Sequence, residues 1–136
     1  RGDAKAAEAA LAAGIAASPR NIDLLLARGG LAARTAGAED ALAWYKRALA
    51  LDDARADVWL GMGLAALYCG KPDLARDYAA KAESLAPSNA DAPLVSAMAH
   101  AMLNEKTEAR AAAERARALS PRQPLPPELE QFLAAP

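Results

Sequence analysis

The chain is expected to be an all-α protein made of stacked helical hairpins, because of its composition and a sequence repeat of constant period. Hydrophobic residues make up 54% of the chain but aromatic residues only 4%, since most of the apolar residues are Ala and Leu. Ala is the best helix former, and its small side chain lets helix axes approach closely. We therefore expect helices joined by thin interfaces rather than one thick core.

Four segments of the chain align without gaps. Their closing residues, Pro19, Asp53, Pro87 and Pro121, are each 34 positions apart. Three further columns share this spacing and consist mainly of small residues: Ala7, Ala41, Ala75 and Ala109; Gly14, Ala48, Ala82 and Ala116; and Leu11, Tyr45, Ala79 and Ala113. Small residues at fixed positions indicate the points where the two helices of a hairpin cross, because a larger side chain would force the axes apart.

These residues resemble the tetratricopeptide repeat, a helical hairpin that recurs with this same spacing. The segment Trp59–Gly63 resembles the tryptophan and leucine-glycine pattern of its first helix, Ala75 and Ala82 match the small residues of its second helix, and Pro87 matches its closing proline. The preceding copy departs from the pattern at Asp53, where proline is usual. The resemblance implies a right-handed α-solenoid of three full hairpin repeats, with an N-terminal half repeat and a C-terminal cap helix. We expect Trp59 to be a large buried anchor.

The helices are expected, in order, near residues 3–17, 21–35, 38–51, 55–69, 72–85, 90–103, 106–119 and 127–134. Local residues support these positions through known preferences at helix ends and turns. Asn21, Asn89 and Asn104 are predicted N-caps, Pro72 is a predicted first helical residue, and Gly37 and Gly70 are predicted turn residues.

The expected organisation is one solenoid domain: a half repeat over 1–21, repeats over 22–55, 56–89 and 90–123, and a cap over 124–136. The first segment supplies only the second helix of a repeat, which would leave Leu11 and Ile15 poorly covered. Either the chain continues upstream or another chain covers this face. The last segment should pack on the fourth repeat through Leu129, Phe132 and Leu133, and the alternative is a linker to something downstream.

Charge and hydropathy narrow the classes of function. The chain has 16 Lys and Arg residues against 17 Asp and Glu residues, so no basic excess favours nucleic acid. Its longest apolar stretch, residues 58–69, is too short to span a bilayer, so we expect no direct membrane insertion. The compartment stays open between cytoplasm and periplasm, and the Ala and Arg usage suggests a bacterial origin.

No motif for catalysis, metal or cofactor binding is recognisable. Cys69 is the only cysteine, so an internal disulfide is impossible, and it is interpreted as a small buried hydrophobe. His100 is the only histidine and is interpreted as a packing residue. We therefore expect neither an enzyme nor a cofactor.

The resemblance implies that the first helix of each hairpin lines a concave groove. The residues predicted to contact a ligand there are Leu26, Arg34, Leu60, Leu64, Tyr68, Leu94, Met98 and Met102. Relatives that clamp a C-terminal carboxylate use Lys, Asn and Arg in these columns, and only Arg34 resembles that chemistry. The mainly apolar lining instead favours an amphipathic helix or an apolar segment. The competing interpretation is that these side chains belong to the core.

Asp23, Asp57 and Asp91 form a further column at the repeat spacing, at the starts of the inner helices. They either stabilise the positive ends of the helix dipoles or form an acidic rim that selects basic groups on a ligand.

The predicted function is a protein–protein interaction scaffold or adaptor that binds a peptide or helix in this groove. The first alternative is self-association into a homo-oligomer. The second is a non-catalytic segment of a larger enzyme, since similar alanine-rich repeats precede the catalytic domain in some bacterial aspartyl/asparaginyl hydroxylase-like proteins.

Overall fold

A computed structural model describes residues 2–136, and over this range the chain forms eight α-helices and no strand. The all-α prediction is confirmed, and every helix begins and ends within one residue of its expected range. The helices are α1 (Gly2–Ala17), α2 (Ile22–Thr35), α3 (Ala38–Leu51), α4 (Ala56–Tyr68), α5 (Pro72–Leu85), α6 (Asp91–Met102), α7 (Lys106–Leu119) and α8 (Pro127–Ala134). None of these helices is both long and apolar enough to cross a membrane.

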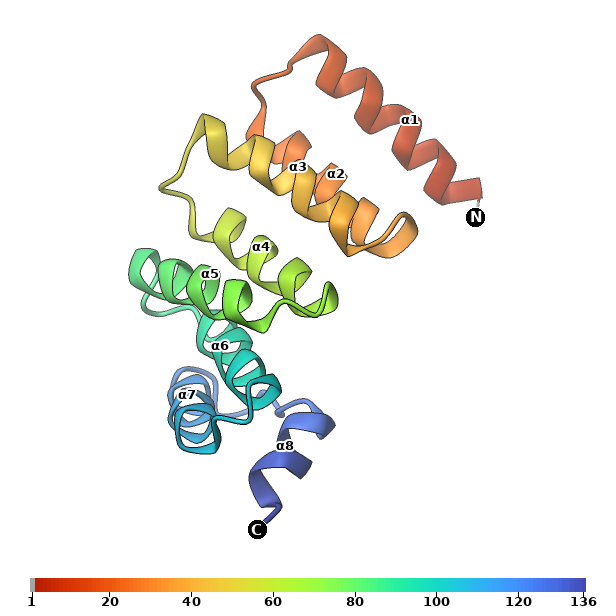
Figure 1. Cartoon of the computed structure of the whole chain (residues 1–136). Helices are drawn as coiled ribbons and strands as arrows, with labels where there is room; N and C mark the ends of the chain where they lie inside the picture. The colour runs from red at the N-terminus through yellow and green to blue at the C-terminus, as the bar shows by residue number, and fades with distance from the viewer. Residues whose placement is uncertain (1) are drawn as a thin grey trace.

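The helices stack as three hairpins, α2–α3, α4–α5 and α6–α7, with α1 and α8 at the two ends of a curved path (Figure 1). Along the series α2, α4, α6 and α8, each helix contacts the next. Within residues 2–136, the other series, α1, α3, α5 and α7, has no such contacts. The stack is therefore curved, with α2, α4, α6 and α8 on the inside; these four are called the inner helices below.

Small residues hold the hairpins together, as the columns predicted. Ala41, Ala75 and Ala109 are 0% exposed in α3, α5 and α7. At Gly63 in α4, an added Cβ would lie 3.6 Å from the Ala75 carbonyl oxygen and 3.1 Å from Val95 Cγ1. A Cβ at this position would therefore be in ordinary contact with the backbone of α5, but it would require the Val95 side chain of α6 to move by a few tenths of an ångström.

Tyr45 of α3 joins two successive repeats. Its ring lies against the glycine backbones of α2 and α4, since a Cβ added to Gly29 would meet its ring carbons at 2.5–2.9 Å and one added to Gly61 at 2.9–3.2 Å. Burial raises the pKa of the Tyr45 phenol, an effect that the positive charge of Arg34 partly opposes. The ring is a wedge between hairpins, and both glycines are needed to seat it.

The prediction of Trp59 as a buried anchor is wrong, because its side chain is only half-buried. Its indole N–H donates to the Asp53 carbonyl oxygen at 2.8 Å, and its ring centre lies 6.0 Å from that of Tyr78. The indole donor requires an acceptor, which holds the ring near the surface turn. Leu25, Val58 and Met62 fill the interior instead.

The helix ends follow local chemistry, with two exceptions among the predicted caps. Asn21 caps α2 by accepting a bond from the Leu24 N–H at 3.2 Å, and Pro72 opens α5. Asn89 lies one residue before the N-cap position of α6 and accepts from the Asp91 N–H. Asn104 has a φ of 62° and forms the turn before α7 rather than its cap, because Asn tolerates the left-handed region.

Turn glycines and the lone cysteine complete the hairpin ends. Gly37 and Gly70 have φ values of 111° and 69°, the positive range in which a side chain is strained, so their predicted place in turns is confirmed. Cys69, expected to be buried, is half-buried because it directly follows the last residue of α4.

The C-terminal helix caps the stack. Leu129 is buried in a cluster with Ala97, Ala112 and Ala113, while Phe132 and Leu133 are half-buried. Leu125, which the sequence did not single out, is also buried in this cluster. The connection from α7 and the helix α8 together close the apolar end of the last hairpin.

Candidate peptide-binding groove

The eight predicted groove residues all lie on inner helices, and none is fully buried. Leu64 is 39% exposed, Tyr68 80% and Met102 52%, and Arg34 is exposed as well. Leu64 and Met98 occupy equivalent positions of neighbouring inner helices, as do Tyr68 and Met102, because one repeat separates the members of each pair. These four side chains define the apolar strip discussed below.

The other three leucines are partly committed to the core. Leu26, Leu60 and Leu94 are half-buried, and each packs against a different cluster of buried residues. Met98 also packs against two of these clusters. The core interpretation therefore applies in part to these four positions, whereas Leu64, Tyr68 and Met102 present large apolar surfaces to solvent.

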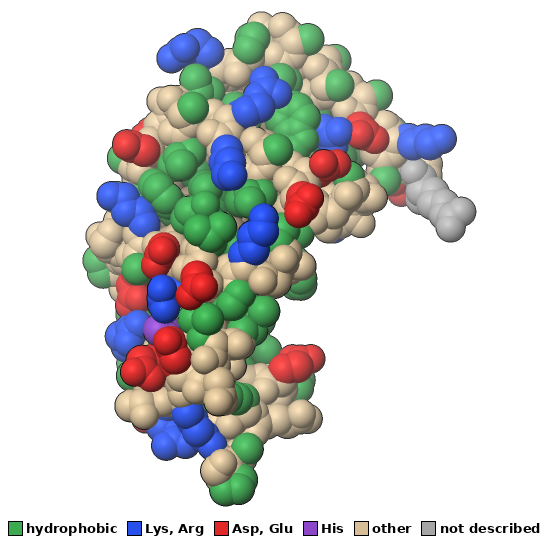
Figure 2. Space-filling model, viewed as in Figure 1, with side chains coloured by type: hydrophobic (Ala, Val, Ile, Leu, Met, Phe, Trp, Pro, Cys, Tyr) green, Lys and Arg blue, Asp and Glu red, His purple; other side chains and the backbone are tan. Residues whose placement is uncertain are grey.

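A hollow of about 330 Å³ extends the apolar strip toward the C-terminus. It lies between α6 and α8, where the outline of the molecule is indented on its concave side (Figure 2). Its lining residues are Met98, Ala101, Met102, Glu128, Leu129 and Phe132. Leu129 and Phe132 are predicted to pack on the last repeat, and neither they nor Glu128 are among the groove residues predicted from the sequence.

A signal for these residues exists in the sequence. Phe132 continues the column Gly30, Leu64 and Met98 at the same repeat spacing. Helix α8 is thus in phase with α2, α4 and α6 and serves as a fourth inner helix, although the composition of residues 124–136 obscures this.

The three aspartates of the predicted rim are exposed and lie in the first turns of α2, α4 and α6. Arg55 bridges two of them, with its guanidinium 2.8 Å from Asp23 and 2.7 Å from Asp57. These bonds raise the pKa of Arg55. Two of the three carboxylates therefore already have an internal cation. Asp91 has none among the described residues.

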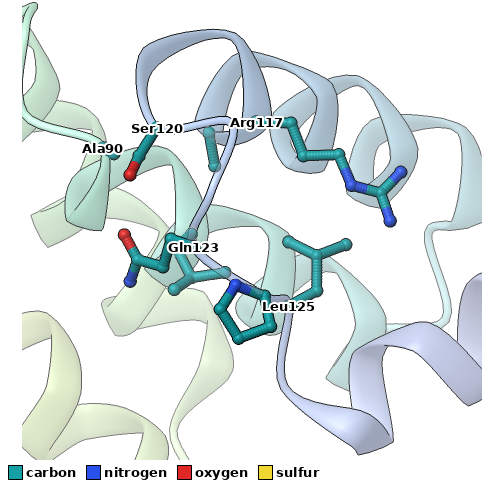
Figure 3. Close-up of a pocket in the computed structure, with 8 residues that line it drawn as sticks. Ala90, Arg117, Ser120, Gln123 and Leu125 are labelled. Atoms are coloured by element: carbon teal, nitrogen blue, oxygen red, sulfur yellow. The ribbon is translucent and has the colours of Figure 1, made fainter.

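Two other surface depressions are unsuited to a peptide. A crevice of about 10 Å³ lies beneath the connection between α7 and α8, near Ser120, Gln123 and Leu125, while Arg117 extends away from it (Figure 3). That volume holds about one water molecule. The depression between α7 and α8 mixes Arg110, Glu114, Arg117 and Glu130 with small apolar residues.

His100 forms a structural contact. Its Nδ1 lies 2.6 Å from Oε2 of Glu105, across the turn between α6 and α7, and its side chain is mostly buried. In the described part of the chain, no group of three or more His, Cys, Asp or Glu residues is placed to hold a metal ion.

The geometry defines a class of protein: a curved helical repeat with an open, mainly apolar inner face. No protein-family model matches the chain, and no curated protein sequence matches it. Solved structures do. A crystal structure of MamA protein aligns with a TM-score of 0.80 at 25% identity, covering 88% of this chain and 66% of that one. Another MamA structure covers 97% and 85%, with a TM-score of 0.82 at 22% identity.

A third match is the second TPR domain of human RPAP3 in complex with an HSP70 peptide, with a TM-score of 0.70 at 24% identity. It covers 79% of this chain and 87% of that one. The repeat period, the small-residue columns and these matches together show that the chain has the fold of tetratricopeptide repeat domains.

Proposed function

We propose that the chain is a protein-interaction module that binds a peptide or helix along the inner faces of α4, α6 and α8. The observation that carries this proposal is the apolar strip of Leu64, Tyr68, Met98 and Met102, which continues into the hollow between α6 and α8. Contiguous exposed apolar surface of this kind usually marks an interaction site. Its burial by a ligand supplies free energy in proportion to the apolar area removed from water.

The proposed role is non-catalytic, because the strip and hollow consist of Leu, Tyr, Met, Ala and Phe with a single carboxylate, Glu128. The second TPR domain of human RPAP3, which has a similar fold, has been solved in complex with an HSP70 peptide, and this supports the proposal that a peptide is the ligand. Only Arg34 among the predicted contact residues is cationic, which favours an apolar segment over a terminal carboxylate as the ligand.

The test requires substitutions that leave the fold intact. Leu64 and Met98 are both predicted contacts, but Met98 packs against two core clusters, so Met98→Glu would also destabilise the protein. Leu64→Glu with Met102→Glu is the cleaner pair, because both side chains are substantially exposed. Leu74→Glu is the matched control, since Leu74 on α5 is 39% exposed, the same fraction as Leu64.

Peptides selected from a displayed random library on the unmodified protein would be measured against each variant by fluorescence anisotropy. We expect the Leu64 and Met102 double variant to lose binding while its helicity, by circular dichroism, matches the parent. The Leu74 variant should bind normally. Undiminished binding by the double variant would place the ligand elsewhere and refute the proposal.

One observation favours self-association as a second candidate function. Ala7 of α1 is exposed, although the equivalent Ala41, Ala75 and Ala109 are 0% exposed beneath their hairpin partners. No described helix covers α1 at Ala7, although α2 covers the same face farther along, where Gly14 lies against Leu24. Ile15 is only 8% exposed there, so the expectation that it would be poorly covered is wrong. Light scattering over a range of concentrations would detect a dimer, and Ala7→Arg should dissociate it if α1 forms the interface.

A further inference from the structure

We propose that the hollow between α6 and α8 receives the apolar face of a basic amphipathic helix supplied by a partner protein, with a lysine or arginine of that helix paired to Glu128. This inference rests on the proposed function and specifies the partner. It depends on the shape of the hollow, on the spacing of the residues around it and on the charges that remain without internal partners.

The shape and lining suit apolar side chains. A volume of about 330 Å³ lies at the lower end of the range for ligand pockets, about 300–1,000 Å³. Met98 and Met102 form one wall and Phe132 with Leu129 the other. Methionine side chains are flexible and polarisable, so this wall adapts to apolar groups of different shapes.

The spacing suits a helix. Met98 and Met102 are four positions apart on α6, and Glu128 and Phe132 are four positions apart on α8 across the hollow. Each pair therefore forms a ridge whose members are about 6 Å apart along the helix axis. Side chains at positions i and i+4 of a partner helix have the same spacing and can pack between these ridges.

The charges select a basic partner. Glu128 takes the position that Leu26, Leu60 and Leu94 occupy in the other inner helices, and it lines the hollow directly. It is exposed and forms no ion pair with any described residue. An apolar ligand that covered this carboxylate without a cation would leave a charge buried and unpaired, which is strongly unfavourable.

Two nearby charges act on this selection in opposite directions: the Lys106 cation opposes it and the Asp91 carboxylate favours it. Lys106 lies 5.9 Å from the Phe132 ring centre but does not pair with Glu128. Asp91, at the start of α6, adds a second unpaired carboxylate to this half of the inner face, whereas Arg55 already neutralises the acids of α2 and α4. The C-terminal half of the groove thus combines the apolar hollow with two carboxylates, Glu128 and Asp91, that have no ion pair to a described residue.

Three synthetic peptides test the inference with the full chain, each about 16 residues long because shorter isolated helices are only marginally stable in water. They share one apolar seam of leucines at i, i+3, i+4 and i+7 spacing, and their polar positions are all Lys, all Gln or all Glu. Fluorescence anisotropy at physiological salt should rank affinity in the order Lys, Gln, Glu. Glu128→Gln should weaken binding of the Lys peptide by about two- to fivefold, the range of a partly exposed ion pair, and leave the Gln peptide unchanged.

Charge reversal and matched controls separate the possible results. Glu128→Lys should invert the ranking, so that the Glu peptide binds better than the Lys peptide. Met102→Glu should weaken all three peptides, and Leu74→Glu should weaken none. If the Gln peptide binds and Met102→Glu blocks it, but Lys and Glu peptides bind equally, the inference falls and the proposed function stands. If no peptide of the three binds, the inference falls, and the library-selected peptides alone decide the proposed function.

Discussion

The packing of Tyr45 against Gly29 and Gly61 predicts that Gly29→Ala lowers stability in the parent protein but raises it when Tyr45 is replaced by Ala. Gly29→Ala replaces the worst helix former after proline with the best, which by propensity alone stabilises a helix by about 1 kcal/mol. In this protein, however, the new Cβ would lie 2.5 Å from Cε1 and 2.9 Å from Cδ1 and Cζ of Tyr45. Carbon atoms in optimal contact are about 3.5–4.0 Å apart.

The ring has little freedom to retreat. Gly61 of α4 stands against its other side, where an added Cβ would lie 2.9 Å from Cζ. Overpacking of this kind typically costs about 1–3 kcal/mol. Gly29→Ala should therefore destabilise the protein by about 0–2 kcal/mol net, once the propensity gain is subtracted.

Gly30→Ala is the matched control, because its Cβ would meet only the Tyr45 hydroxyl oxygen at 3.9 Å, an ordinary contact. It should stabilise the protein by about 1 kcal/mol. When Tyr45 is replaced by Ala, the clash at Gly29 disappears, and Gly29→Ala should then be stabilising as well. The coupling between the two positions should be about 1–3 kcal/mol.

The assay is urea unfolding followed by far-UV circular dichroism, with the midpoints of Gly29→Ala, Gly30→Ala, Tyr45→Ala and the Gly29/Tyr45 double variant compared. The reasoning would be refuted if Gly29→Ala were equally destabilising with and without Tyr45. It would also be refuted if Gly29→Ala matched Gly30→Ala in the parent, since the wedge would then not restrict Gly29.

Three further predictions concern packing, titration and the indole contact. Ala75→Leu should lower the free energy of unfolding by about 1–3 kcal/mol through overpacking of the α4–α5 crossing, measured by urea unfolding, and an unchanged midpoint would contradict the crossing geometry. Burial raises the pKa of the Tyr45 phenol above its usual value of 10.0, because the folded protein favours the neutral phenol. The contribution of this group to the free energy of unfolding is therefore fully present below pH 10.0 and is lost as the pH rises through the raised pKa. Tyr45→Phe should flatten this alkaline loss of stability, and an identical pH profile for the variant would disprove the contribution. Trp59→Phe removes the hydrogen bond to the Asp53 carbonyl oxygen and should lower the free energy of unfolding by about 1 kcal/mol, measured by thermal unfolding; an unchanged midpoint would contradict this contribution.

The sequence was sufficient to predict the number of helices and their bounds. Helix ends depend on local chemistry, such as the cap at Asn21, Pro72 at the first position of α5 and the positive-φ turns at Gly37 and Gly70. The stacking order also follows, because a hairpin cannot bury its apolar face alone and small residues recur at each crossing. Helix ends depend on residues close together within one repeat, and the stacking order depends on residues that recur at the 34-residue spacing.

Contacts between repeats were not predictable in the same way. The sequence placed Leu64, Met98 and Met102 on inner helices, but whether each side chain is exposed depends on how far neighbouring hairpins are rotated. The half-buried position of Trp59 follows from a hydrogen bond to a turn, and the masking of Asp23 and Asp57 follows from Arg55, which lies between the two repeats. Neither side-chain exposure nor these contacts can be predicted from the type of residue that recurs at each position of the repeat.

The repeat pattern thus determined the helices, their order and the face that each presents, because these depend on backbone preferences and on the size of side chains at regular intervals. The hollow between α6 and α8, the unpaired Glu128 within it and the wedge of Tyr45 between Gly29 and Gly61 came only from the folded chain. They depend on the distances between side chains of different repeats, and small differences in helix rotation and spacing set those distances.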